Sequence, residues 1–314
     1  MNIKELGGEF KLIERITRRV SNRNVIVGIG DDAAVIRFGG KNLVITSDMI
    51  CEGDHFSRAY FTPRQIGIKA MNSNLSDIAA MGGRPLYALS SIALSRDTDI
   101  ETMDGFYGGL YDTAMFYGVD IIGGDTTHSS VMVICLTLLG EVKPNLTVLR
   151  SGAKPGDIIK VTGELGGSTA GLRLFLKKID GFDEVKLKHT EPRCRLDVSD
   201  TIACMATAME DVSDGLASEV RNICRMSGTG AVIFKDKIPI NDLTFKAAST
   251  VGEDAFDYAL YGGEDFELVY TVPKDRIDSL PGTVVGEIIE EKNIYLEEAA
   301  VLSKVEKFGF DHFA

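Results

Sequence analysis

The residues in this sequence with the greatest capacity for chemistry are acidic side chains that stand within or at the ends of apolar stretches, often beside glycine, serine or threonine. They are Asp31-Asp32, Asp48, Asp77, Asp125, Asp211, Asp214 and Glu264-Asp265. Carboxylates in such surroundings are unfavourable unless a cation neutralises them. Mg²⁺ takes oxygen ligands and leaves coordination positions for phosphate oxygens. The repeated pattern therefore predicts a site that holds several Mg²⁺ ions.

Other catalytic patterns are weak. The run G-E-L-G-G-S at 163–168 lacks the lysine of a P-loop, and V-G-I-G-D-D at 27–32 lacks the third glycine of a dinucleotide fingerprint. No G-x-S-x-G nucleophile motif occurs, and the chain has four histidines. Taken alone, Asp31-Asp32 is also compatible with an exposed turn. His55 is compatible with a local hydrogen bond in a loop or with donation to a substrate phosphate.

The composition narrows the function classes. The chain has 314 residues and a formal net charge of −12, which argues against a general nucleic-acid binder. Its five cysteines form no C-x-x-C pair and indicate free thiols in a reducing cytoplasm. The N-terminal segment lacks signal-peptide features, and no apolar run reaches about 18 residues, so we expect neither export nor a membrane span.

The hydrophobic pattern must also supply elements that position these acids. A helix is expected over 9–20, and a short buried strand over 119–122 leads into a glycine turn that carries Asp125. The segment that begins at Asp211 is expected to open a helix, with Asp214 as its cap. Strands, helices and hairpins are mixed without strict βαβ alternation, which favours an α+β fold over a doubly wound sheet.

The best-defined element is a helix from Pro63 to about Met81. Thr62 is a good N-cap, and proline is favoured at the first helical position. The spacing places Asn74 and Asp77 on the packed face of this helix. A carboxylate there needs a partner or a metal ion.

The run S-G-A-K-P-G-D at 151–157 is rich in glycine and proline and lies at mid-chain. We therefore expect an N-terminal α+β domain over 1–149 and a C-terminal α+β domain over 150–314. Arg150 and Lys154 lie beside this boundary, where either could neutralise a phosphate.

The motifs, taken together, resemble those of the thiamine-monophosphate kinase family, within the aminoimidazole ribonucleotide synthetase superfamily. They come in order and cover nearly the whole chain. They are G-I-G-D-D-A-A-V (28–35), T-S-D (46–48), E-G-D-H-F (52–56), N-L-S-D-I-A-A-M-G (74–82), G-G-D-T-T (123–127), R-S-G-A-K-P-G-D (150–157), D-V-S-D-G-L (211–216), G-G-E-D-F-E-L (262–268) and G-F-D-H-F-A (309–314).

The resemblance implies a two-domain fold of the aminoimidazole ribonucleotide synthetase type, in which the N-terminal domains of two subunits share a β-barrel. It implies Mg²⁺ ligands at Asp32, Thr46, Ser47, Asp48, Asp77, Asp125, Asp211 and Asp214. It implies ATP contacts at Tyr107, Gly124, Asp125, Arg150 and Ser213. It implies contacts to thiamine monophosphate at His55, Glu264 and Phe310. The C-terminal domain would complete the nucleotide and substrate site.

The activity implied is ATP- and Mg²⁺-dependent phosphorylation of thiamine monophosphate to thiamine diphosphate by direct in-line transfer. The acceptor phosphate is largely a dianion at neutral pH, so metals and positioning suffice and no acid, base or nucleophile is expected. Two alternatives stay open at this point. One is another ATP-dependent enzyme of the superfamily, such as a purine-biosynthesis cyclo-ligase, and the other is a non-catalytic nucleotide or metal sensor.

Overall fold

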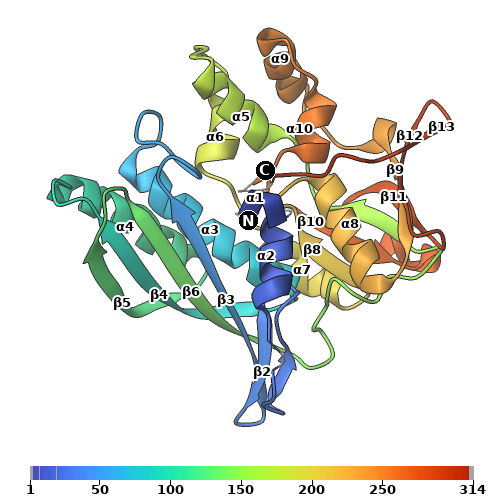
Figure 1. Ribbon diagram of the computed structural model, residues 1–314, viewed down its shortest axis with the longest axis horizontal. Coiled ribbons are helices and arrows are strands. Elements are labelled where there is room, and N and C mark those ends of the chain that lie inside the picture. The colour runs from blue at the N-terminus through green and yellow to red at the C-terminus, as the bar shows by residue number, and fades with distance from the viewer. Residues whose placement is uncertain (1–2, 7, 19, 311–314) are drawn as a thin grey trace.

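The computed structural model describes residues 3–6, 8–18 and 20–310 (Figure 1). Residues 311–314 of the G-F-D-H-F-A motif lie outside the described residues. Two sheets lie on opposite sides of one long helix, α3 (Pro63–Ala80). The α+β prediction is confirmed.

The first sheet has the strand order β1-β2-β3-β6-β4-β5, and its neighbours are antiparallel except for the parallel pair β4 and β5. Its strands are β1 (Val25–Val27), β2 (Ala34–Phe38), β3 (Lys41–Cys51), β4 (Arg84–Leu94), β5 (Asp120–His128) and β6 (Val133–Val142). Helices α3 and α4 (Ile100–Phe116) cover one face of it. Because side chains alternate along a strand, β3 presents Thr46 to this covered face and Ser47 to the opposite face.

The second sheet has the order β13-β12-β9-β11-β7-β10-β8. Its strands are β7 (Ile158–Val161), β8 (Ala208–Asp211), β9 (Gly230–Phe234), β10 (Leu268–Val272), β11 (Thr283–Ile289), β12 (Ile294–Glu298) and β13 (Val301–Lys304). The remaining helices are α1 (Ile3–Leu6), α2 (Glu9–Ile16), α5 (Gly167–Leu176), α6 (Asp183–Thr190), α7 (Leu196–Ala203), α8 (Leu216–Ser227), α9 (Asp242–Val251) and α10 (Ala255–Tyr261). Short 3₁₀ turns occupy Lys235–Lys237 and Lys274–Ser279.

Helix α3 is the element that joins the two halves. It packs on β3, β6 and α4 on one side and on α7 and β8 on the other. Its N-terminus is fixed as expected, because the Thr62 side chain accepts a hydrogen bond from the Gln65 backbone and the Gln65 side chain accepts one from Thr62. Polar side chains such as Lys69 and Asn74 are buried along it, in accord with the expected packed face.

Expectations about two elements of the N-terminal half were wrong. Helix α2 ends at Ile16 instead of continuing to 20, because Thr17 turns to an extended conformation and its hydroxyl donates to the Ile13 carbonyl. The strand expected to be short and buried at 119–122 is the long, mostly exposed edge strand β5. Asp125 therefore lies within a strand, and not in a turn.

The start of α8 also differs from the prediction. Asp211 ends strand β8, and the helix begins only at Leu216. Asp214 does not cap it: Gly215 occupies the N-cap position with a φ of 112°, and the Asp214 backbone N–H donates to Glu219 Oε1 at 2.7 Å. A glycine is needed there because this backbone conformation is strained for other residues.

In the described part of the chain, we find no helix with the length and apolar character required to cross a bilayer.

Candidate active site

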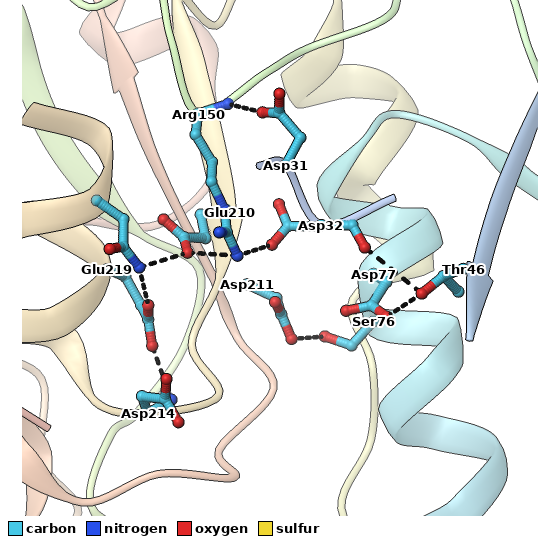
Figure 2. Close-up of polar contacts among 11 residues, drawn as sticks. Asp31, Asp32, Thr46, Ser76, Asp77, Arg150, Glu210, Asp211, Asp214 and Glu219 are labelled. Atoms are coloured by element: carbon cyan, nitrogen blue, oxygen red, sulfur yellow. Dashed lines mark hydrogen bonds and ion pairs between the residues drawn. The ribbon is translucent and has the colours of Figure 1, made fainter. Parts of the chain in front are cut away.

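Three aspartates from three separate elements converge between the two sheets (Figure 2). Asp32 follows β1, Asp77 lies on α3 and Asp211 ends β8. Each offers a carboxylate oxygen within 4.8 Å of the others. The motif resemblance implies that all three bind metal, and the fold brings them together.

Each of these carboxylates is oriented by a neighbouring side chain. The Thr46 hydroxyl donates to Asp77 Oδ2 at 2.5 Å, and the Ser76 hydroxyl donates to Asp211 Oδ2 at 2.6 Å (Figure 2). Asp32 Oδ1 accepts from the Arg150 guanidinium at 2.6 Å, whereas Asp32 Oδ2 is buried and has no hydrogen-bond partner among the described residues. A buried oxygen in that state is well suited to a cation.

The electrostatics of the cluster favour the same interpretation. Burial, together with repulsion from Asp32, raises the pKa of Asp211 to about 8. Burial and repulsion from Asp211, Asp48 and Asp32 raise the pKa of Asp77 well above its usual range. Such carboxylates are unfavourable as neighbouring anions and become favourable once a divalent ion lies between them. Because the available donors are all oxygens, the residues fit Mg²⁺.

A chain of buried polar groups extends from Asp32 into the C-terminal half (Figure 2). Arg150 Nη2 lies 2.6 Å from Asp32 Oδ1 and 2.7 Å from Glu210 Oε1. The Asn222 amide then donates to Glu210 Oε1 at 3.0 Å and to Glu219 Oε2 at 3.3 Å. Glu219 in turn accepts a hydrogen bond from the Asp214 backbone N–H, so this series of polar contacts ends at Asp214.

Asp31 has a different task from Asp32. Its Oδ1 accepts the backbone N–H of Arg150 at 2.7 Å. The first acid of the pair thus holds the segment that carries Arg150, and the second faces the carboxylate cluster. This arrangement places an expected metal ligand beside an expected ATP contact.

A second group of expected site residues lies around Glu264. Its backbone N–H donates to the Ser213 carbonyl at 2.8 Å, so the loops carrying Glu264 and Ser213 lie against each other. The Lys69 ammonium bridges Glu264 Oε2 and the His55 carbonyl, at 2.8 Å to each. His55 Nδ1 accepts the backbone N–H of Cys51 at 3.2 Å, which leaves Nε2 as the N–H donor of the ring.

Asp48 and Phe310 lie at the borders of these groups. The Asp48 backbone N–H donates to Asn74 Oδ1 at 3.1 Å, and burial raises the pKa of the Asp48 carboxyl although attraction to His55 opposes this shift. The Phe310 backbone N–H donates to the Asp214 carbonyl at 3.3 Å. The C-terminal segment is thereby brought to the loop that carries Ser213 and Asp214.

Four expected residues belong to none of these groups of contacts within this chain. Asp125 and Gly124 lie on edge strand β5, which β6 and β4 separate from β3. Tyr107 lies on α4, with its ring centroid 5.0 Å from that of Phe106. The Ser47 hydroxyl lies on the other face of β3, 2.9 Å from the Thr137 hydroxyl.

Several buried polar residues of the site were missed from the sequence. They are Ser76, Lys69, Glu210, Glu219 and Asn222. The sequence could have indicated Ser76 and Lys69, because both lie on the helix whose packed face is expected to carry Asn74 and Asp77. Glu210 stands one residue before a motif, but nothing in its own neighbourhood distinguished it from a surface acid.

Comparison with known proteins places the chain in a family. The family described as AIR synthase related protein, N-terminal domain, matches residues 30–142, and the corresponding C-terminal domain matches residues 154–298. The thiamine-monophosphate kinase of Aquifex aeolicus is 35% identical over 100% of both chains. That of Bacillus subtilis is 36% identical, covering 97% of this chain and 99% of the relative. This chain belongs to the thiamine-monophosphate kinase family.

Solved structures agree with this membership of the thiamine-monophosphate kinase family. One described as AaThiL complexed with AMPPCP and TMP superposes with a TM-score of 0.91 at 34% identity, covering 100% of this chain and 99% of the other. The thiamine monophosphate kinase of Aquifex aeolicus superposes with a TM-score of 0.83 at 32% identity, covering 95% and 98%. The resemblance seen in the motifs and the two-domain fold of the aminoimidazole ribonucleotide synthetase type are confirmed.

Proposed function

We propose that this protein transfers the γ-phosphoryl group of ATP to thiamine monophosphate, giving ADP and thiamine diphosphate, with Mg²⁺ as the required cation. The observation that carries the proposal is the convergence of Asp32, Asp77 and Asp211 beside Arg150 in a chain that matches named thiamine-monophosphate kinases over its full length. A structural neighbour that was solved with AMPPCP and TMP supports both substrates.

The transfer requires neutralisation of charge more than covalent catalysis. A bond forms between an oxygen of the acceptor phosphate and the γ-phosphorus, and the bond from that phosphorus to the bridging oxygen of ADP breaks. The acceptor, with a second pKa near 6, is already largely a dianion at neutral pH, so no general base has to remove a proton. Bound Mg²⁺ would reduce the repulsion between the two anionic substrates.

The residues of the chain have separable tasks in this proposal. Asp32, Asp77 and Asp211 would hold the cations, with Thr46 and Ser76 fixing the orientation of two of them. Asp48 and Asp214 would extend this set. Arg150 and Ser213 would contact the nucleotide, and His55, Glu264 and Phe310 would contact the acceptor.

A direct assay tests the activity. Purified full-length protein is incubated with ATP, Mg²⁺ and thiamine monophosphate, and ADP and thiamine diphosphate are quantified, with EDTA and acceptor-free samples as controls. Equal amounts of ADP and thiamine diphosphate are expected, and the absence of both would contradict the proposal. Stimulation of ATP turnover by a formylglycinamidine ribonucleotide would point to the cyclo-ligase alternative, and tight ATP binding without turnover to a sensor; the named relatives favour neither.

We further propose that the working form is a homodimer. One face of the first sheet carries exposed apolar side chains, including Met49, Tyr87, Leu89 and Ile122, which is typical of an interface. A barrel shared by two copies would join the β5 edge of one sheet to the β1 edge of the other. It would bring Asp125 toward the Asp31-Asp32 segment of the second copy.

Mixing two inactive variants tests this arrangement. Asp77→Asn and Asp125→Asn are each purified, then unfolded and refolded together. If Asp125 acts in the site of the second copy, each mixed dimer has one intact site, and about a quarter of the wild-type activity should return. No recovery, with mixed dimers demonstrated by mass, would mean that Asp125 acts within its own chain.

We also propose a cytoplasmic location, where ATP and Mg²⁺ are supplied. Cell fractionation checks this location.

A further inference from the structure

Lys69 is a buried lysine to which the proposed reaction assigns no task. Its side chain on α3 is 0% exposed. The ammonium Nζ lies 2.7 Å from Glu264 Oε1 and donates hydrogen bonds of 2.8 Å to Glu264 Oε2 and to the His55 carbonyl. The ammonium group is therefore surrounded by three oxygen acceptors.

The groups that Lys69 contacts come from opposite halves of the molecule. His55 lies in the loop after β3, and Glu264 lies in the loop before β10. Glu264 has a φ of 65°, which is unusual for a residue other than glycine, and its N–H donates to the Ser213 carbonyl. Lys69 therefore forms hydrogen bonds with two residues, His55 and Glu264, that are expected to contact the same substrate.

The surroundings leave one side of Glu264 accessible. The Glu264 side chain is 25% exposed, whereas His189, whose Nδ1 lies 3.4 Å from Glu264 Oε2, is only 2% exposed. The centroid of the Phe61 ring lies 5.3 Å from the Lys69 ammonium, so an aromatic ring covers the side of the ammonium that faces no oxygen. The carboxylate can thus receive a ligand while its inner side is held by the protein.

A buried charge of this kind is poorly explained by stability alone. Taking an ammonium out of water is costly, and a hydrophobic residue of similar size often serves a fold at least as well. Burial raises the pKa of Glu264, but attraction to Lys69 and the hydrogen bonds from Lys69 outweigh it, leaving the pKa below its usual value. Lys69 thus keeps an accessible carboxylate ionised and fixed in one orientation.

We propose that Lys69 is a positioning residue of the acceptor site, which holds the Glu264 carboxylate and the His55 main chain in the arrangement that receives a cationic heterocycle. The inference rests on the proposed function, in which the acceptor carries a thiazolium cation. An anionic carboxylate attracts such a ring. Because Glu264 and His55 are assigned to the acceptor and not to the nucleotide, Lys69 governs affinity for the acceptor and leaves affinity for ATP unchanged.

The test measures KM for each substrate in wild type, Lys69→Met, Glu264→Gln and the double variant. Lys69→Met should raise KM for thiamine monophosphate by about tenfold or more, since a charged hydrogen-bond network is lost. KM for ATP should stay within about twofold of wild type. The double variant should resemble Glu264→Gln alone, because Lys69 acts through Glu264. Calorimetric titration with thiamine monophosphate in the absence of ATP should show the same loss of affinity.

Controls separate this inference from the fold and from the proposed function. Lys41→Met removes an exposed lysine that is paired with Glu141 and should change neither KM. If Lys69→Met does not fold, Lys69→Gln retains a hydrogen-bond donor without the charge and should show the same selective rise. An equal rise in both KM values, or additive losses in the double variant, would overturn the positioning role. A wild-type enzyme that does not phosphorylate thiamine monophosphate would contradict the proposed function instead.

Discussion

Asp77 is half-buried beside other carboxylates, and burial together with their repulsion raises its pKa well above the usual range. We predict that Asp77→Asn stabilises the metal-free protein by about 1 kcal/mol, because a half-buried acid that is repelled by neighbouring carboxylates is replaced by a neutral amide, while turnover falls at least about a hundredfold. Urea unfolding in EDTA and steady-state assays in Mg²⁺ measure the two effects. Asp125→Asn changes an exposed acid, so its unfolding free energy should stay within about 0.5 kcal/mol of wild type. A destabilised Asp77→Asn protein would contradict the electrostatic argument.

Arg150 is shared between Asp32 and Glu210, so the charge on Glu210 should influence how the guanidinium serves the nucleotide. With Glu210→Gln, Asp32 becomes the single carboxylate partner of Nη2 and should draw the guanidinium closer. We expect KM for ATP to rise about threefold to tenfold with little change in KM for thiamine monophosphate. Substrate-saturation curves for each substrate provide the measurement. Glu141→Gln, on the surface, is the matched control, and an equal effect on both substrates would argue against this division of tasks.

Single residues differ in how far the sequence could reveal their place. Asp32, Asp77 and Asp211 could be proposed because carboxylates recur beside apolar stretches along the chain, and the motif resemblance selected Asp32 from the Asp31-Asp32 pair. Lys69 could not be paired with Glu264 in advance, since 195 positions separate the two partners. The direction of Ser47 follows from the alternation along β3, which a strand prediction without a known covered face does not resolve.

The contact between α3 and α4 depends on glycines that allow the two helices to approach closely. A Cβ atom at Gly109 would lie 2.0 Å from the Arg64 carbonyl oxygen, whereas one at Gly108 would have its nearest neighbour, an Arg64 side-chain nitrogen, at 3.8 Å. We predict that Gly109→Ala destabilises the protein by about 1–3 kcal/mol through overpacking. Gly108→Ala should be neutral or stabilising by about 0.5–1 kcal/mol, because alanine favours the helix. Chemical denaturation of the pair measures the difference, and similar values for both would refute the close-packing argument.

At the scale of elements, local signals predicted the ends of α3 well and the character of β5 poorly. Thr62, Pro63 and Gln65 determine the start of α3 through contacts within one turn. The run at 119–122 is apolar enough to suggest burial, yet β5 lies at the edge of its sheet. The close approach that Gly124 permits, where a Cβ would lie 1.8 Å from the Ser90 carbonyl oxygen, depends on a neighbour that the local sequence does not reveal.

At the scale of the whole molecule, the site exists only because α3 lies between the two sheets. A buried apolar cluster joins Ala79 and Ala80 at the end of α3 to Met209 and Tyr270 of the second sheet. The same packing brings Asp77 to Asp211 and Lys69 to Glu264. Folding of the two halves should therefore be coupled, and groups at their junction should affect the stability of the whole chain.

His189 is such a group, because it faces Lys69 and Glu264 across the junction and its Nδ1 lies 3.1 Å from the Ser168 hydroxyl. Burial, reinforced by Lys69 and opposed by Glu264, lowers the pKa of His189 from 6.5 to about 3. Between these two values the unfolded chain binds a proton that the native protein does not. The free energy of unfolding should therefore fall as the pH falls through this range, by up to about 1.4 kcal/mol per pH unit.

Unfolding in urea between about pH 7 and pH 5 tests this link, with an expected loss of about 2 kcal/mol attributable to His189. His189→Gln should remove that part of the slope whatever its effect on absolute stability, since glutamine does not titrate. His128→Gln, at an exposed position on β5, is the control and should retain the wild-type slope. Other buried acids titrate in the same range, but they are common to all three proteins and cancel in the comparison. Parallel slopes for wild type and His189→Gln would mean that the native protein accommodates a protonated His189, and that the junction is open to water there.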